Sequence, residues 1–176
     1  MVRLIPQSEA PTPDHDDPVW EVLPAALWDL DFRQTLAWIE EQGCSDADEF
    51  KQLVRKDPDA LAKCLDKTRV RRASAGAVAL VGAASEEECI RRAPELLTVE
   101  SKTDFLRVLM AAFRNERDVH IETAIITCAH EPRDVRVHWR FLPNADGKFE
   151  RAIVSVVDMT AERELQQRLL LAERMS

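Results

Sequence analysis

The side chains that could carry chemistry in this 176-residue chain are few and lie far apart in the sequence. Histidine titrates near neutral pH, and a carboxylate in a pocket can act with it as a general base. The strand positions that could supply such a pair are Asp29, Asp31 and His138. Proton abstraction needs a buried acid with a raised pKa, but alternation places all three on the less apolar faces of their strands. An α+β cone enzyme with a pocket carboxylate and a histidine is therefore the alternative hypothesis.

Other patterns of reactive side chains are weaker. The sequence contains no nucleophile elbow, no phosphate-binding loop and no metal-binding pair of histidines. The cysteines never form a Cys-x-x-Cys pair, so we expect reduced structural thiols and no metal site. They are Cys44, Cys64, Cys89 and Cys128. His130 and His138 are expected to be solvated, and proton sensing by either stays open because histidine titrates near neutral pH.

Composition limits the classes of partner. The formal net charge is -8, and the isoelectric point is near 5.1. Binding to nucleic acid or to an anionic membrane calls for clustered positive charge, so we expect neither partner. No apolar run is long enough to span a bilayer, and the first residues lack the apolar core of a signal peptide. The sequence therefore predicts a cytoplasmic chain of one domain.

The first half of the chain is expected to combine two strands with three short helices. Residues 1–18 hold prolines and acids without periodicity, which predicts a disordered tail. Residues 22–32 alternate with period two, which predicts a first strand with one covered face. The next segments predict helices over 34–42, 45–57 and 59–67, and a second strand over 68–72.

The second half is expected to hold more helices and then three consecutive strands. A short helix over 73–82 and a helix that begins at Ser85 precede a strongly amphipathic helix over 100–115. Alternating residues predict strands over 119–128, 135–142 and 149–157, with a turn at residues 144–147 before the last one. Because strands and helices are segregated in this order, the sequence predicts an α+β fold.

The C-terminal stretch divides at Asp158-Met159-Thr160. A β-branched run before this step predicts a strand, and a run of helix formers after it predicts a helix with Thr160 as its N-cap. Leu165, Leu169 and Ala172 form one apolar stripe on that helix, with little chain left to cover it. We therefore expect the stripe to pair with a second helix, and folding back onto the sheet is the alternative.

These features together resemble a PAS domain. The Asp-Met-Thr step between a strand and an acidic, leucine-bearing helix is similar to the close of that family, and residues 77–82 resemble its short helix after the second strand. Ser74 and Ala75 stand where the family has Asn and Pro, which removes a common capping side chain. The resemblance implies a five-stranded antiparallel sheet with helices on one face. The insertion between the first two strands looks like that of some bacterial sensor kinases.

The resemblance implies a function as well. We expect residues 19–160 to form a sensory domain and residues 161–176 to begin a coiled-coil signalling helix that makes a homodimer. Asp158, Met159 and Thr160 are the expected signal-relay residues. Because the chain ends within a helical pattern, an effector in the same polypeptide is expected to follow. A two-component histidine kinase is the first choice and a diguanylate cyclase the alternative. The fragment itself is not expected to be an enzyme, and a scaffold that senses nothing is a third possibility.

Cofactors can be compared by residue type within the resemblance. Relatives that form a flavin photo-adduct need an Asn-Cys-Arg-Phe motif, which the sequence lacks, and relatives that bind haem place a histidine on the long helix, where residues 100–115 hold none. His120, in a strand, is a poor haem ligand. We predict no cofactor, and an unidentified small molecule stays open. The candidate cavity residues, which could equally be ordinary core, are Trp28, Phe105, Leu109, Val137, Trp139 and Phe141.

Overall fold

The computed structural model describes residues 17–175, so most of the predicted tail lies outside the described residues. Its strands are β1 (Ala26–Asp31), β2 (Arg69–Ala73), β3 (Asp118–Ile126), β4 (Pro132–Leu142) and β5 (Arg151–Asp158). Its helices are α1 (Val19–Val22), α2 (Arg33–Glu41), α3 (Ala47–Lys56), α4 (Ala60–Lys67), α5 (Ala75–Val81), α6 (Glu86–Arg92), the 3-10 turn η1 (Ala93–Leu96), α7 (Val99–Phe113) and α8 (Thr160–Met175).

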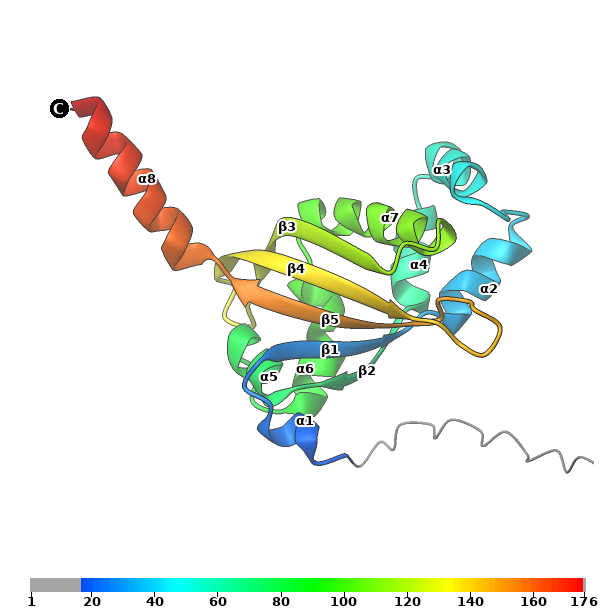
Figure 1. Cartoon of the computed structure of the whole chain (residues 1–176), viewed down its shortest axis with the longest axis horizontal. Coiled ribbons are helices and arrows are strands. Elements are labelled where there is room, and N and C mark those ends of the chain that lie inside the picture. The colour runs from blue at the N-terminus through cyan, green and yellow to red at the C-terminus, as the bar shows by residue number, and fades with distance from the viewer. Residues whose placement is uncertain (1–16, 176) are drawn as a thin grey trace, which may run out of the picture.

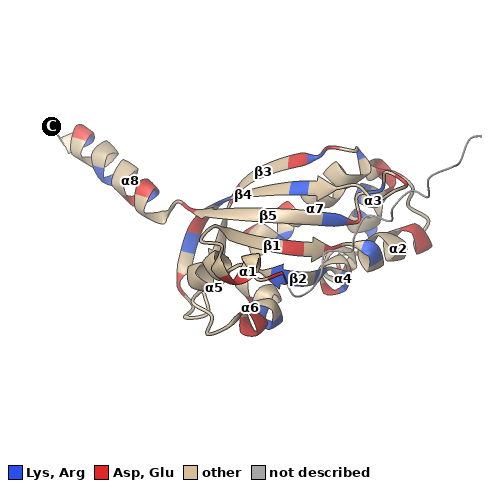
Figure 2. Cartoon of the chain, turned by 60° about the horizontal axis from the view of Figure 1, so that its bottom comes forward, with Lys and Arg blue, Asp and Glu red and all other residues tan. Residues whose placement is uncertain are grey.

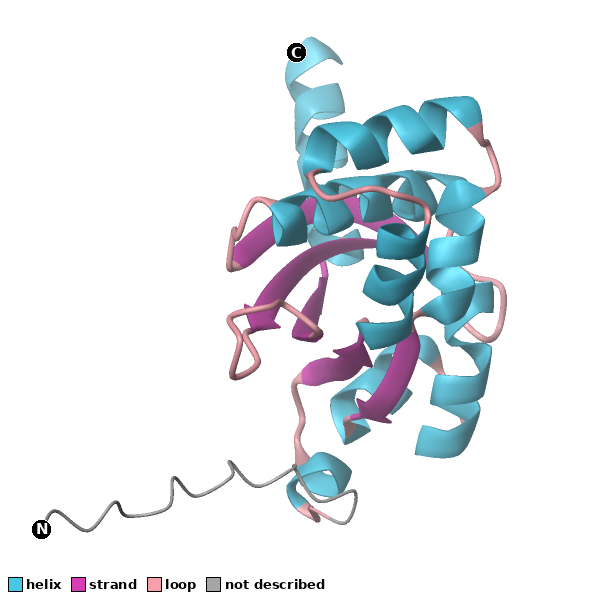
Figure 3. Ribbon diagram, turned by 90° about the vertical axis from the view of Figure 1, so that its right-hand side faces the viewer, coloured by secondary structure: helices cyan, strands magenta, loops and turns pink. Residues whose placement is uncertain are grey.

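The strands form one antiparallel sheet in the order β2-β1-β5-β4-β3. The helices between β1 and β3 cover one face of this sheet, and the other face is open (Figures 1 and 3). β1 and β5 are neighbours although they lie at opposite ends of the sequence, so the last strand closes the centre of the sheet. The predicted α+β arrangement, with a helical insertion between the first two strands, is confirmed.

The chain before β1 differs from the prediction of a strand that starts at residue 22. The structure has the short helix α1 there, and β1 begins only at Ala26. Pro24 explains the delay. The residue before a proline is pushed out of the helical region, and Leu23 accordingly has φ -65° and ψ 117°. The helix therefore ends at Val22, and the chain turns before it joins the sheet.

Ser74 corrects the expectation that this segment lacks a capping side chain. Its Oγ accepts a hydrogen bond from the backbone N–H of Ala77 at 3.1 Å, which caps α5. The same oxygen accepts from the N–H of Leu27 at 2.9 Å and donates to the carbonyl of Ala25 at 2.6 Å. One buried hydroxyl thus joins the start of α5 to the start of β1.

Aromatic rings fill the core at one end of the sheet. The ring centroids of Phe32 lie 6.2 Å from those of Phe105 and 5.9 Å from those of Phe141. Phe141 in turn stacks on Phe149, with centroids 5.5 Å apart. Phe32, Phe105, Phe141 and Phe149 are all at most 8% exposed, so solvent is excluded from this cluster.

Acidic and basic residues are interspersed along the strands (Figure 2), and two of the acids correct the sequence prediction. Asp29 and Asp31 were expected on a less covered face, but they are only 2% and 8% exposed. Arg151 of β5 donates two hydrogen bonds to Asp29, at 2.8 and 2.7 Å, and Arg33 donates to Asp31. Burial alone raises the pKa of Asp31, but the hydrogen bonds from Arg33 outweigh it and leave the pKa below its ordinary value.

Within residues 17–175, no helix combines the length and the apolar character that crossing a membrane requires.

Candidate functional site

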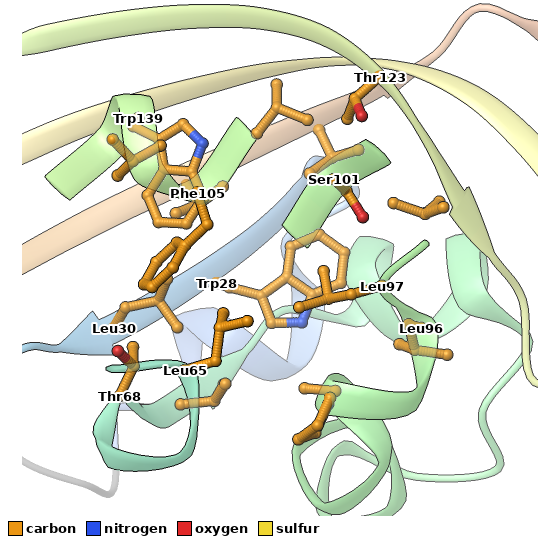
Figure 4. A pocket seen from close by; sticks show the side chains of 18 of the residues that line it. Trp28, Leu30, Leu65, Thr68, Leu96, Leu97, Ser101, Phe105, Thr123 and Trp139 are labelled. Carbon is orange, nitrogen blue, oxygen red and sulfur yellow. The ribbon is translucent and has the colours of Figure 1, made fainter. Parts of the chain in front are cut away.

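A cavity of about 270 Å³ lies between the helix-covered face of the sheet and the helices. The sheet supplies its floor, and α4, α6, η1 and α7 supply its walls. Most lining side chains are apolar (Figure 4). They include Trp28, Leu30, Leu65, Val70, Val81, Ile90, Leu96, Leu97, Phe105, Val108, Ile121, Ile125, Val137, Trp139, Val154 and Val156.

The structure brings four of the six candidate cavity residues together. These four are Trp28, Phe105, Val137 and Trp139. The other two, Phe141 and Leu109, do not line the cavity. Phe141 is 1% exposed and sits in the packed aromatic cluster, while Leu109 is fully buried in the core from α7. Both predictions were wrong for the same reason. Periodicity shows which side chains of a strand or helix point inward, but it does not show where the packed interior leaves a cavity.

Few polar groups reach the cavity. The Ser101 hydroxyl is engaged in the capping box of α7 with Thr98, and the Thr68 hydroxyl donates to the carbonyl of Cys64 at 2.9 Å. Thr123 of β3 differs from both, because its Oγ1 is buried without a hydrogen-bond partner. Alternation along the strand predicted over 119–128 puts Thr123 on the same face as Ile121 and Ile125, but the sequence alone gave Thr123 no role. A hydroxyl between two isoleucines was the available signal.

Two charged residues also border the cavity. The Arg91 side chain is 68% exposed, so its guanidinium stays in water. The Asp104 carboxylate is 21% exposed and lies 3.8 Å from the guanidinium of Arg107, one helical turn away. Neither charge is therefore buried and unpaired at the cavity, and the interior of the site is close to neutral.

The expected relay residues form the joint between β5 and α8. Asp158 accepts a hydrogen bond from the N–H of Thr160 at 2.9 Å, so Asp158 supplies the capping oxygen. Thr160 was predicted as the N-cap, but it is the first helical residue. Its Oγ1 accepts from the N–H of Asp134 at 3.0 Å, and the N–H of Met159 donates to the carbonyl of Asp134 at 2.7 Å. Met159 is 8% exposed. The joint is thus fastened to β4.

Arg163, which the sequence prediction missed, fastens the first turn of α8 more firmly. Its guanidinium donates to Glu122 of β3 at 2.8 Å and lies 3.8 Å from the carboxylate of Asp134. Arg136 also donates to Glu122. A cation in the first turn of a helix opposes the helix dipole, so its presence there was a signal that it serves some other contact.

Beyond this first turn, α8 leaves the domain and projects away from it (Figure 1). Leu165 and Leu169 of the predicted stripe are 58% and 57% exposed, and Ala172 is exposed as well. Leu170 and Leu171 are each 59% exposed. The alternative in which the stripe folds back onto the sheet is not what the structure shows, and an apolar surface remains without a cover.

His120 and His138 lie on the open face of the sheet, away from the cavity. The rings of His120 and His138 face each other across β3 and β4, with centroids 4.3 Å apart. His138 Nε2 lies 2.7 Å from Asp118, whose pKa is lowered by that hydrogen bond. This acid–histidine pair is on an exposed surface. Among residues 17–175, no group of three or more potential ligand side chains is placed to hold a metal ion.

No family model matches the chain, and no curated protein matches its sequence. Solved structures do match in fold. A light-oxygen-voltage domain studied with a flavin analogue gives a TM-score of 0.50 at 14% identity, over 86% of this chain and 89% of that one. A sensory box histidine kinase/response regulator from Burkholderia thailandensis gives 0.51 at 13%, over 86% and 89%. The PAS domain of a Colwellia psychrerythraea protein gives 0.51 at 11%, over 81% and 92%.

These likenesses agree with the strand order and with the helices on one face, and the chain therefore has the PAS fold. At such low identities they show the fold alone. The same fold can carry unrelated activities, so function has to be argued from the cavity and the joint at α8.

Proposed function

We propose that this chain is a cytoplasmic sensory and dimerisation module that reports occupancy of its cavity through α8. One observation carries the proposal. Val154 and Val156 of β5 line the cavity, and β5 ends at Asp158, where the joint to α8 begins. A ligand that pushes on these valines therefore acts on the same strand that positions the helix.

The joint is suited to relay such a push. The backbone carbonyl of Asp134 in β4 accepts a hydrogen bond from the N–H of Met159, and the backbone N–H of Asp134 donates to the Thr160 hydroxyl. The Asp134 carboxylate lies 3.8 Å from the guanidinium of Arg163. The first turn of α8 is therefore tied to β3 and β4. A shift of β5 against β4 would rotate or tilt α8 instead of being absorbed by a loose linker.

The partners of the module follow from its exposed helix. On this proposal the stripe of Leu165, Leu169 and Ala172 pairs with the same stripe of a second copy, and the pair passes the signal to an effector in the same polypeptide. A histidine kinase is the favoured effector, because one protein with the same fold is a sensory box histidine kinase/response regulator. A diguanylate cyclase is the alternative that the family resemblance leaves open.

Catalysis by this chain itself is the weaker proposal. A pocket enzyme would need an acid and a histidine inside the cavity. Asp29 and Asp31 alternate with Trp28 and Leu30, which line the cavity, so their carboxylates lie on the opposite face of the sheet, where arginines hold them. His138 pairs with Asp118 on that same open face.

Native mass spectrometry followed by amide hydrogen exchange tests the sensing role. We expect the purified chain to carry a non-covalent mass that is lost under denaturing conditions, and we expect its removal to change exchange in β5 and in the first turn of α8. Exchange of α2, which is remote from the joint, is the internal control. If loaded and emptied protein exchange alike over residues 154–165, the relay is refuted.

A further inference from the structure

The orphaned hydroxyl of Thr123 indicates what kind of ligand the cavity accepts. This inference rests on the sensing role proposed above. Thr123 is 7% exposed, and among the described residues its Oγ1 is the buried side-chain oxygen or nitrogen that lacks a partner. Leaving a buried hydroxyl unpaired is costly, so it calls for an explanation. The hydroxyl belongs to a side chain that lines the cavity (Figure 4).

Other hydroxyls at the cavity cannot serve in its place. Ser101 exchanges hydrogen bonds with Thr98, and Thr68 bonds to Cys64 and to Thr35. The donor hydrogens of Ser101 and Thr68 are therefore committed to the start of α7 and the end of α4. Among the described lining residues, Thr123 is thus the hydroxyl whose donor hydrogen has no partner within the protein, so it can donate to a ligand without breaking a bond.

The walls around this hydroxyl favour a ring compound. Three aromatic side chains from three elements surround the space: Trp28 of β1, Phe105 of α7 and Trp139 of β4. The ring centroids of Phe105 and Trp139 lie 6.2 Å apart, and the Trp28 side chain is 8% exposed. Aromatic faces held in this way bind flat apolar molecules well.

The volume of the cavity and the charged residues beside it further restrict the class of ligand. The cavity of about 270 Å³ lies below the usual range of about 300–1,000 Å³ for sites that hold drug-sized molecules. Arg91 keeps its charge in solvent, and Asp104 lies beside Arg107. The remaining lining residues carry no charge, so a charged ligand group among them would be buried without a counter-ion, which is unfavourable.

We propose that the cavity binds a small, neutral, mainly apolar ring compound whose single hydroxyl, carbonyl or ring nitrogen exchanges a hydrogen bond with Thr123 Oγ1. The hydroxyl both donates and accepts, so either polarity of ligand group satisfies it. The hydroxyl has no partner among the described protein groups, and a ligand group would supply one. Selectivity for a ring with one polar group over the plain hydrocarbon then comes from Thr123.

The test compares 2-naphthol with 2-methylnaphthalene, which has nearly the same shape but no hydrogen-bonding group. Dissociation constants are measured by NMR titration of the indole N–H signals of Trp28 and Trp139, with Trp20 and Trp38, which lie outside the cavity, as internal controls. The affinity ratio of the two probes is determined for wild type, Thr123→Val and Thr123→Ser. Valine keeps the shape without the hydroxyl, and serine keeps the hydroxyl.

The expected result is a preference for 2-naphthol that falls about five- to tenfold in Thr123→Val and survives in Thr123→Ser. Free Thr123→Val should also melt a few degrees higher than wild type, because the orphaned hydroxyl is gone. An equal ratio in wild type and Thr123→Val would overturn the inference while leaving cavity binding intact. If neither probe shifts Trp28 or Trp139, the cavity does not admit such compounds and the inference also fails. Probe binding that leaves the signals of residues 158–163 unchanged would refute the relay alone.

Discussion

At the scale of single residues, the Ser74 hydroxyl stabilises the fold by joining α5 to the start of β1. It is fully buried and makes three hydrogen bonds, to Ala25, Leu27 and Ala77. Replacing Ser74 with alanine leaves these backbone groups unpaired in the interior. We expect the free energy of unfolding to fall by about 2–4 kcal/mol, measured by urea unfolding with the slope m unchanged.

Ser85→Ala is the matched control for this variant. Ser85 also caps a helix, α6, through one hydrogen bond to the N–H of Glu88, but it is exposed and joins nothing else. Its loss should cost about 1 kcal/mol, as for an ordinary cap. Equal losses in the two variants would mean that Ser74 is no more than a cap.

The buried cysteines predict how stability depends on alkaline pH. Desolvation by burial raises the pKa of Cys64 to about 12 and that of Cys89 to about 11, from an ordinary value of 9.0. Above pH 9 the unfolded thiols ionise while the folded ones stay protonated, so stability that is complete below pH 9 is lost as the pH rises toward 11. The expected loss is about 1 kcal/mol per pH unit for each thiol.

Urea unfolding under reducing conditions at pH 8, 9 and 10 measures this loss. The chain has no tyrosine, so no phenol titrates in the same range. Lysines do titrate there, but they are common to the wild type and to the Cys64→Ala, Cys89→Ala double variant. The double variant should therefore lose less stability over this interval. Parallel pH profiles for the two proteins would contradict the assignment.

What the sequence could reveal about single residues depended on whether the signal was local. Trp28 and Trp139 reach the cavity because alternation along a strand fixes which face each side chain takes. Asp29 has the same alternation, yet its burial depends on Arg151, which lies 122 positions away in the sequence. Two properties of Thr123 likewise depend on how distant elements pack: its hydroxyl lacks a protein partner, and its side chain lines the cavity.

At the scale of elements, Arg163 decides how firmly α8 is held. It bridges Glu122 of β3 and Asp134 of β4 and is only half exposed. Arg163→Gln removes both ion pairs. Since pairs of this kind contribute roughly 0.2–1 kcal/mol each, we expect amide exchange in the first turn of α8 to become about fivefold faster. Exchange in wild type should rise likewise at high salt, which screens the pairs.

Arg168→Gln provides the control, because it makes the same change of charge on the same helix. Within residues 17–175 no ion pair of Arg168 with the sheet is found, and the residue lies beyond the first turn. Its exchange pattern near Thr160 should match that of wild type. An equal effect of the two substitutions would show that the net charge of α8, and not the clamp to the sheet, sets the exchange rate.

Most elements were predictable because their signals are local. Period-two alternation located β3, β4 and β5, and capping residues such as Ser85 located the helix starts. The error at α1 came from reading alternation through Pro24, where backbone geometry overrides the pattern. The error at Thr160 arose because its hydroxyl turns to a strand that is distant in sequence.

At the scale of the whole molecule, the projecting helix is the feature that the rest of the structure leaves unexplained. An isolated helix of the length of α8 is marginally stable in water, and its leucines at positions 165, 169, 170 and 171 are all more than half exposed. The first turn of α8 is tied to β3 and β4, and the helix then projects away from the domain (Figure 1). Pairing with a second copy would cover this surface, and the spacing of Leu165, Leu169 and Ala172 suits a two-helix seam.

The double substitution Leu165→Glu, Leu169→Glu should therefore break the proposed dimer. We expect the dissociation constant from sedimentation velocity to rise at least about tenfold, since two buried leucines contribute more than 1.4 kcal/mol on burial. Gln166→Glu with Gln167→Glu adds the same negative charge away from the stripe and should leave the dimer nearly intact. A chain shortened at residue 160 should be monomeric under the same conditions. If that shortened chain associated as strongly as the whole one, the dimer would have to form through the sheet, and the relay through α8 would lose its output.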